Sequence, residues 1–338
     1  MVLDTTGAAA PVSAETAQDA SKRDGADKAA ADQKSVPAPG EAAGNVSASA
    51  AAEKPIDRPQ DGVHGTVILL NGRTEFIEKY GEVIGELLDR RFFVAALDWR
   101  GQGGSERVVK GNRLKGHIDD MDSYVEDLTA LLEFLDTTNC PRPFFCLAHS
   151  TGGQVLLRAA PLVQDRIQRA VTTAPFLDLV PVKMSVATIY RLVAFFTYAG
   201  LGELYAPTVS SKPPTSEAFE GNALTSDPAR FARNRTLIEA HPELAIGGPT
   251  IAWVYAALTS ARAIQERGHV SRISLPILML SASEDRIVSS RAVERVAGLI
   301  RTAAHLSVPG ARHEILMERD ALRAQFWAAF DAFIPGSQ

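Results

Sequence analysis

The 338-residue sequence predicts an α/β domain in which a mostly parallel sheet is covered by helices on both faces. Two observations support this prediction. From Thr66 onward, short apolar runs alternate with longer segments whose apolar residues recur every three or four positions, as on one face of a helix. The short runs are apolar at successive positions, which is typical of strands that are buried on both faces.

The predicted elements alternate along the chain. The first strand covers Thr66 to Leu70, and apolar residues between Phe76 and Leu88 form one face of the helix that follows it. Further strands are predicted at Phe92–Leu97, Phe144–Ala148, Arg169–Ala174, Pro276–Ser281 and His305–Val308, and further helices at Tyr124–Leu135, Gln154–Val163, Ala292–Ile300 and Leu322–Phe333.

Two segments depart from this alternation. Residues 1–62 contain 17 alanines and no aromatic residue, and we predict a disordered Ala-rich tail because this composition buries little apolar surface. Residues 63–180 and 273–338 are the two parts of the predicted core. Residues 181–272 show helical periodicity without a clear strand, and because the insertion far exceeds an ordinary connection we predict a helical lid.

Composition excludes several classes of function. The net charge is −5, but residues 1–62 hold 10 acidic and 6 basic residues, which leaves 30 acidic and 29 basic residues in the nearly neutral remainder. We therefore expect no nucleic-acid partner. The sequence predicts neither a secretory signal nor a transmembrane helix. Cys140 and Cys146 are expected to be reduced thiols, which favours a cytoplasmic location.

The strongest chemical signal is Ser150, which lies between a predicted strand and a predicted helix in the segment Ala148-His149-Ser150-Thr151-Gly152-Gly153. This segment matches the G-x-S-x-G nucleophile elbow with alanine in place of the first glycine. Small residues are required two positions before and two positions after the serine, because the strained turn brings neighbouring backbone close. A serine N-cap is the alternative interpretation, and the flanking strand and helix favour the nucleophile.

A serine nucleophile needs a histidine to accept its proton and a carboxylate to orient that histidine, in the chain order serine, acid, histidine. His313 follows the last predicted strand in a loop at its carboxyl end, whereas His305 lies within that strand. The loop after the preceding strand offers both Asp285 and Glu284, and Asp178 after an earlier strand is a weaker rival.

Acyl transfer also needs two backbone N–H donors for the developing oxyanion. Thr151, directly after the nucleophile, provides the first donor. Gly72 permits an unusual turn after the first strand that would direct the Arg73 N–H into the site, although a plain glycine turn is the alternative. The sequence does not assign a role to the Arg73 side chain, and one hypothesis is that it contacts an anionic or polar headgroup.

Together these motifs resemble the α/β-hydrolase superfamily, and within it the bacterial lysophospholipases and monoacylglycerol lipases of the serine-aminopeptidase-like branch. The resemblance runs from about residue 65 to residue 335 and rests on Asn71–Phe76, Asp98–Gly103, Ala148–Gly153, Leu224–Pro228, Asp285 and His313. It implies Ser150, Asp285 and His313 as the catalytic triad, with Asp285 preferred over Glu284 by the family pattern. It also implies the Arg73 and Thr151 amides as the oxyanion hole, a structural role for Arg100, and no metal or organic cofactor.

The resemblance implies hydrolysis of carboxylic esters of monoacyl lipids, namely lysophospholipids or monoacylglycerols, through an acyl-enzyme. The alternatives are a general carboxylesterase, a non-catalytic binding protein, or an aminopeptidase whose lid would hold the substrate amine through Glu203, Glu217 or Glu220. Apolar lid residues between Ile189 and Leu204 and between Trp253 and Tyr255 either pack the lid on the core or line an acyl-chain pocket with peripheral membrane contact.

Two departures from the family pattern matter. Asn71-Gly72 stands where relatives usually have His-Gly, and Ala148-His149 stands where they have Gly-His, although neither change removes a donor. Relatives also open with a β-hairpin and a further strand before the strand that matches Thr66–Leu70. This region is the Ala-rich tail here, so the sheet is expected to lack its first two strands.

Overall fold

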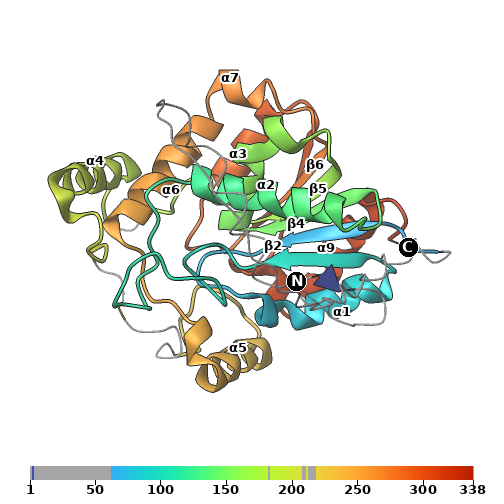
Figure 1. Ribbon diagram of the computed structural model, residues 1–338, viewed down its shortest axis with the longest axis horizontal. Coiled ribbons are helices and arrows are strands. Elements are labelled where there is room, and N and C mark those ends of the chain that lie inside the picture. The colour runs from blue at the N-terminus through green and yellow to red at the C-terminus, as the bar shows by residue number, and fades with distance from the viewer. Residues whose placement is uncertain (1, 4–61, 182, 208–210, 212–217, 338) are drawn as a thin grey trace, which may run out of the picture.

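A computed structural model describes residues 2–3, 62–181, 183–207, 211 and 218–337, and these residues form a sheet flanked by helices (Figure 1). The strand order is β1-β3-β2-β4-β5-β6-β7, and every neighbouring pair is parallel except β1 with β3. The strands are β1 Val2–Leu3, β2 Thr66–Leu70, β3 Phe93–Leu97, β4 Phe144–His149, β5 Ile167–Thr173, β6 Ile277–Ala282 and β7 Ala303–Val308.

Helices cover both faces of the sheet, as predicted. Alternate residues of β2 separate two cores, because successive side chains of a strand point to opposite faces. Val67 and Leu69 pack with helices α1 and α9, whereas Ile68 and Leu70 pack with α2, α3 and α8 on the other face. The helices are α1 Gly81–Asp89, α2 Asp122–Thr137, α3 Thr151–Val163, α8 Ser290–Leu299 and α9 Asp320–Phe333.

The predicted element boundaries needed small corrections. Strand β2 has the predicted bounds, and β3 to β7 differ from the predictions by one or two residues at their ends. The predicted helix after β2 divides into a 3₁₀ turn, Ile77–Tyr80, and α1. The Ile77 N–H donates to Asp98 Oδ1 at 3.0 Å instead of to a helical carbonyl, which holds the start of this segment against the loop after β3.

The prediction of a disordered Ala-rich tail over residues 1–62 does not hold for Val2 and Leu3. Val2 and Leu3 form β1, which pairs antiparallel with Ala95 and Val94 of β3. The free edge of β3 offers unpaired backbone groups that such a segment can satisfy, and two residues are too few to show a period in the sequence. One short opening strand is therefore present, and residues 4–61 of the predicted tail lie outside the described residues.

A helical insertion separates β5 from β6. It contains α4 Val186–Phe196, the π-helical turn η3 Thr197–Leu201, α5 Pro228–Ala240, the 3₁₀ turn η5 Pro242–Leu244, α6 Ile251–Ile264 and α7 Arg267–Val270. Helix α6 packs against α3 of the core and against α4, which lies at the edge of the molecule away from the sheet (Figure 1). No helix within the described ranges is long and apolar enough to span a membrane. The role of this insertion as a lid stays a prediction.

Candidate active site

Ser150 occupies a sharp turn between β4 and α3. Its backbone has φ 49° and ψ −111°, a conformation that a non-glycine residue adopts only where its surroundings enforce it. The Ser150 N–H donates to the Thr173 carbonyl of β5 at 3.0 Å, and its carbonyl accepts from the Phe176 N–H at 3.0 Å. Ser150 stands at the N-cap position of α3, but its hydroxyl makes no capping hydrogen bond to the helix.

The small residues after Ser150 have a steric cause. A Cβ at Gly152 would lie 2.3 Å from the carbonyl oxygen of Leu70, and one at Gly153 would lie 2.8 Å from Cβ of Pro175. Ala148, which replaces the usual first glycine, is a fully buried residue of β4 whose φ is not positive. The alanine is thus accommodated without backbone strain.

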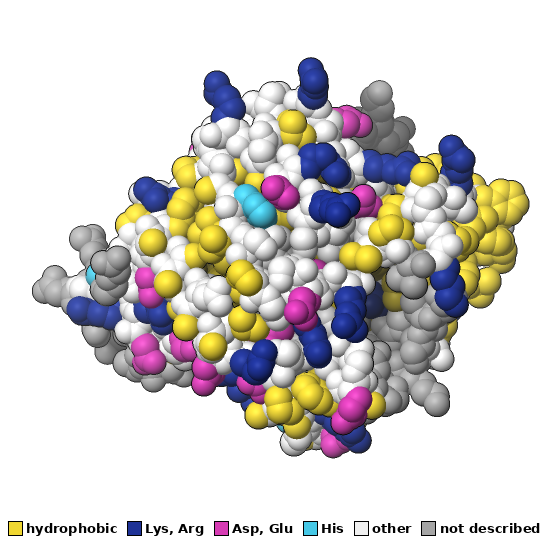
Figure 2. Space-filling view, turned by 180° about the vertical axis from the view of Figure 1, so that it is seen from behind, with side chains coloured by type: hydrophobic (Ala, Val, Ile, Leu, Met, Phe, Trp, Pro, Cys, Tyr) yellow, Lys and Arg dark blue, Asp and Glu magenta, His cyan; other side chains and the backbone are white. Residues whose placement is uncertain are grey.

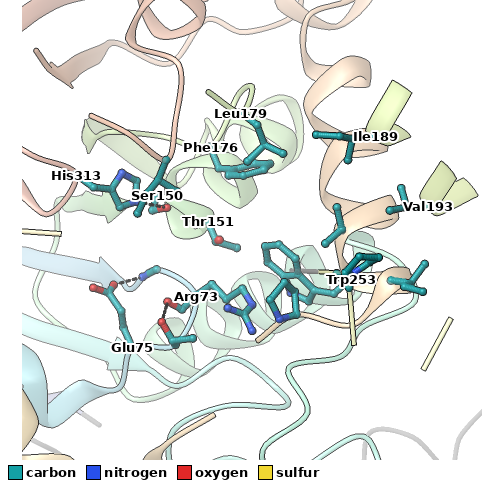
Figure 3. A pocket seen from close by; sticks show the side chains of 18 of the residues that line it. Arg73, Glu75, Ser150, Thr151, Phe176, Leu179, Ile189, Val193, Trp253 and His313 are labelled. Carbon is teal, nitrogen blue, oxygen red and sulfur yellow. Dashed lines mark hydrogen bonds between the residues drawn. The ribbon is translucent and has the colours of Figure 1, made fainter. Parts of the chain in front are cut away.

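The structure brings Ser150, His313 and Asp285 together from three separate loops. His313 Nε2 lies 3.0 Å from Ser150 Oγ, and His313 Nδ1 lies 2.7 Å from Asp285 Oδ2. Asp285 follows β6, His313 follows β7, and both side chains are almost fully buried. Figure 3 shows His313 directly beside Ser150 at one end of a pocket.

Burial and pairing act in opposite directions on this pair. Burial by itself raises the pKa of Asp285, but the facing His313 and the N–H groups of Ile287 and Val288, at 2.8 and 2.9 Å, hold that pKa below its usual value. Burial lowers the pKa of His313, and the Asp285 carboxylate outweighs it and raises that pKa above the usual value. The carboxylate therefore stabilises a protonated His313.

The structure does not bring the rival residues to Ser150. Glu284 is exposed, and the Asp178 carboxylate accepts the Leu179 N–H at 2.9 Å. His305 belongs to β7, and its Nε2 lies 2.9 Å from Oγ of Ser281 on the neighbouring strand β6.

Two backbone N–H groups beside Ser150 have no acceptor within the described part of the chain: those of Thr151 and Arg73. Thr151 is the first residue of α3, whose N-terminal N–H groups lack helical partners. The Gly72 N–H, in contrast, donates to Glu75 Oε2 at 2.5 Å. The loop after β3 supports this turn, because the Gln102 amide donates to the Gly72 carbonyl at 2.8 Å. Arg100 in the same loop pairs with Asp127 of α2 at 2.6 Å.

A buried charge network behind this turn was missed by the sequence analysis. Lys79 Nζ lies 2.6 Å from both Glu75 Oε1 and Glu314 Oε1, and the Tyr80 hydroxyl donates to Glu75 Oε2 at 2.6 Å. Burial raises the pKa of Glu75, but Lys79 and other partners lower it to about 2. The four-residue spacing of Glu75 and Lys79 was the available signal, because such residues are neighbours on a helical turn.

His149, next to Ser150 in sequence, is neutral. Burial lowers its pKa to about 4, and its Nδ1 lies 3.1 Å from the Thr173 carbonyl. Its ring centre lies 4.9 Å from that of His313, so His313 has an uncharged neighbour on this side.

Ser150 and His313 open into a cavity of about 470 Å³. Its wall is mostly apolar and comes from the core loops and from α4 and α6 of the insertion (Figure 3). The apolar lining residues include Phe176, Leu179, Ile189, Leu192, Val193, Phe196, Ile251, Trp253, Val254 and Ile287. Among the described residues, no cluster of three or more His, Cys, Asp or Glu side chains could hold a metal ion.

This architecture, with a serine on a strained strand-to-helix turn and a histidine after the last strand, defines the α/β-hydrolase fold. Solved structures agree. A monoacylglycerol lipase from Paleococcus ferrophilus superimposes with a TM-score of 0.63 at 20% identity, covering 80% of this chain and 95% of that one. A monoglyceride lipase from Saccharomyces cerevisiae superimposes with a TM-score of 0.65 at 17% identity, covering 84% of this chain and 90% of that one.

The chain belongs to the Serine aminopeptidase, S33 family, whose model matches residues 61–320. It is similar to Lysophospholipase L2 of Escherichia coli, with 31% identity over 76% of either chain. It is also similar to a Probable lysophospholipase L2 of Haemophilus influenzae, with 27% identity over 82% of this chain and 86% of the relative. These findings make the chain a carboxylic ester hydrolase.

Proposed function

We propose that the chain hydrolyses the acyl ester bond of monoacyl glycerolipids, lysophospholipids or monoacylglycerols, through an acyl-enzyme on Ser150. The observation that carries the proposal is the Ser150–His313–Asp285 chain of hydrogen bonds at the end of an apolar cavity of about 470 Å³. A cavity of this size and lining suits one acyl chain. The names of the relatives, lysophospholipase and monoglyceride lipase, support the same substrate class.

In the proposed mechanism, His313 Nε2 accepts the Ser150 proton while Oγ attacks the acyl carbonyl carbon. The resulting oxyanion accepts hydrogen bonds from the Arg73 and Thr151 N–H groups. The bond to the glycerol oxygen then breaks, His313 returns the proton to that oxygen, and the alcohol leaves. In the second half of the reaction, His313 accepts a proton from a water molecule whose oxygen attacks the acyl carbonyl carbon. The bond to Ser150 Oγ then breaks, His313 returns the proton to Oγ, and the fatty acid leaves.

The charges of the pocket favour an ester over an aminopeptidase substrate. An aminopeptidase needs a free carboxylate for the substrate ammonium, but the pocket carboxylates Glu75 and Glu314 already share Lys79. Glu203 and Glu220 do not line the cavity, and Glu217 lies outside the described residues. The Arg73 guanidinium, which does line the cavity, would repel an ammonium group.

A substrate panel tests this function. We expect kcat/KM to be highest for monoacyl lipids with long chains, lower for p-nitrophenyl acetate, and negligible for aminoacyl p-nitroanilides, because only a long acyl chain fills the apolar cavity. Rates would be measured with one substrate at a time under identical conditions. Rapid hydrolysis of p-nitrophenyl acetate with no turnover of long-chain lipids would contradict the lipid assignment, and rapid release of p-nitroaniline would support the aminopeptidase.

We further propose that α4 and η3 contact a membrane. Five apolar side chains are exposed in and just after these helices: Leu192, Phe195, Tyr198, Leu201 and Leu204. Phe195 is 66% and Tyr198 80% exposed, and Leu192 both lines the cavity and reaches the surface. Figure 2, seen from behind, shows hydrophobic side chains gathered at the edge that α4 occupies in Figure 1. A patch of this kind on a lipid hydrolase suits an interface with its substrate.

Phe195→Glu is expected to reduce binding to phosphatidylglycerol vesicles about tenfold, because a charged group replaces a side chain that would be buried in the lipid. Co-sedimentation would measure the bound fraction. Leu162→Glu is the matched control, since Leu162 is 73% exposed but lies on α3, outside the patch, and should leave binding unchanged. Equal binding by all three proteins would exclude this contact surface.

A cytoplasmic location stays a proposal. It is supported by Cys140 and Cys146, both free and buried, because unpaired thiols persist in reducing compartments.

A further inference from the structure

We infer that the Arg73 side chain forms a phosphate subsite beside the acyl-transfer centre and selects monoacyl lipids that carry a phosphate in their headgroup. This inference rests on the proposed function and narrows its substrate. Arg73 would then serve twice, with its backbone N–H at the oxyanion and its guanidinium at the headgroup.

The charge balance of the cavity is the first argument. Among the ionisable side chains that line it, Glu75 and Glu314 share Lys79, and His313 is paired with Asp285. Arg73 has no carboxylate within ion-pairing distance among the residues that the structure describes. Among the described residues that line the cavity, Arg73 is therefore the one permanently cationic side chain, and it has no carboxylate partner.

The hydrogen bonds of the guanidinium are the second argument. Nη2 donates to the Gly247 carbonyl of the insertion at 2.5 Å, whereas the buried Nε has no partner among the residues that the structure describes. A guanidinium carries five N–H donors, and the described residues accept from few of them. The group lies 5.1 Å from the centre of a Trp253 ring, which fixes its position. Figure 3 shows it on the Trp253 side of the cavity, with Glu75 on the other side of the turn.

Burial makes an unpaired cation costly. It lowers the pKa of Arg73 to about 10, so the guanidinium still carries its charge at neutral pH. An anion that enters the cavity would replace the lost solvation and occupy the free donors. Guanidinium groups match phosphate oxygens in geometry and form two parallel hydrogen bonds with them.

The position of Arg73 also matches the chemistry of a lysophospholipid. In a 1-acyl lysophospholipid only the glycerol unit and its oxygens separate the phosphate from the ester carbonyl. A carbonyl oxygen held by the Arg73 N–H would therefore place the phosphate within the range of the side chain of the same residue. A monoacylglycerol has a neutral hydroxyl at that position and leaves the guanidinium unpaired.

The test compares two substrates that differ only in the phosphate: 1-lauroyl-glycerol 3-phosphate and 1-lauroyl-glycerol, both below their critical micelle concentrations. We expect Arg73→Met to lower the ratio of their kcat/KM values, phosphate over neutral, on the order of tenfold to a hundredfold, the usual range for hydrogen bonds to a charged group. Arg73→Lys keeps the charge without the forked geometry and should give an intermediate ratio. Glycerol 3-phosphate should inhibit the unmodified enzyme competitively and inhibit Arg73→Met much more weakly.

Arg107→Met is the matched control. Arg107 likewise donates to a carbonyl of the insertion, that of Glu243 at 2.6 Å, but it does not line the cavity. Its substitution should leave the substrate ratio unchanged.

Equal losses for both substrates in Arg73→Met, or an unchanged ratio, would overturn the inference, because Arg73 would then only tie the turn after β2 to the insertion. Failure of the proposed function gives a different result: the unmodified enzyme would hydrolyse neither lipid, and no fluorophosphonate would label Ser150. If Arg73→Met does not fold, the ratio of Arg73→Lys and inhibition by glycerol 3-phosphate still decide the question.

Discussion

Ser150→Ala is expected to reduce kcat for ester hydrolysis by about 10⁴-fold or more, because no acyl-enzyme can form without the serine oxygen. The oxyanion donors and the apolar cavity remain in this variant, so binding of the lipid should change little. Initial rates of fatty-acid release at saturating substrate would measure the loss. A variant that retained more than a tenth of the activity would exclude Ser150 as the nucleophile.

Ser289→Ala is the matched control for this substitution. The Ser289 hydroxyl accepts the Ala292 N–H at the start of α8, whereas the Ser150 hydroxyl caps no helix. Loss of the cap should lower the free energy of unfolding by about 1 kcal/mol and leave kcat intact. Ser150→Ala should show the opposite pattern, with activity lost and stability retained, as measured by thermal denaturation.

Asp285→Asn is expected to reduce kcat/KM by about 10⁴-fold at neutral pH. The amide keeps the shape of the carboxylate, but its nitrogen can donate to His313 Nδ1, which moves the ring proton to Nε2. His313 could then no longer accept the Ser150 proton. The exposed Glu284 offers the control, because Glu284→Gln removes a charge from the same loop and should leave kcat/KM nearly unchanged.

The pH dependence provides a second measurement on the same variant. The mechanism requires neutral His313, so kcat/KM should be full above the pKa of this residue and fall as the pH decreases through it. Asp285 raises this pKa above its ordinary value of about 6.5, and the fall should therefore begin at a correspondingly higher pH. The residual activity of Asp285→Asn should have its midpoint at lower pH. An unchanged midpoint would show that Asp285 does not act on His313.

The fold could be predicted because the apolar pattern of each helix and strand lies within a short stretch of the sequence. The two-residue strand β1 was missed, since its pairing with Ala95 of β3 leaves no period that a sequence can show. Asp285 and His313, whose side chains the structure brings to Ser150, could be predicted because the fold fixes the chain order of the triad and the strand ends that carry it, and the family pattern decided between Asp285 and Glu284.

The Glu75–Lys79–Glu314 network could not be derived in the same way. Glu314 lies 235 positions beyond Lys79, and only the folded chain brings Lys79 Nζ and Glu314 Oε1 to a distance of 2.6 Å. Nearly all side chains of α4 are apolar, so the sequence does not show which of them face the cavity and which face outward. In the structure Val193 lines the cavity and Phe195 is exposed. That division depends on how α4 packs against α6.

One measurement tests the central claim most directly: treatment of the enzyme with a fluorophosphonate probe, followed by peptide mass spectrometry. The account predicts one stoichiometric adduct on the Ser150 oxygen, with no adduct in Ser150→Ala and a greatly slowed reaction in Asp285→Asn. A folded protein that remains unlabelled, or one labelled at another serine, would contradict it.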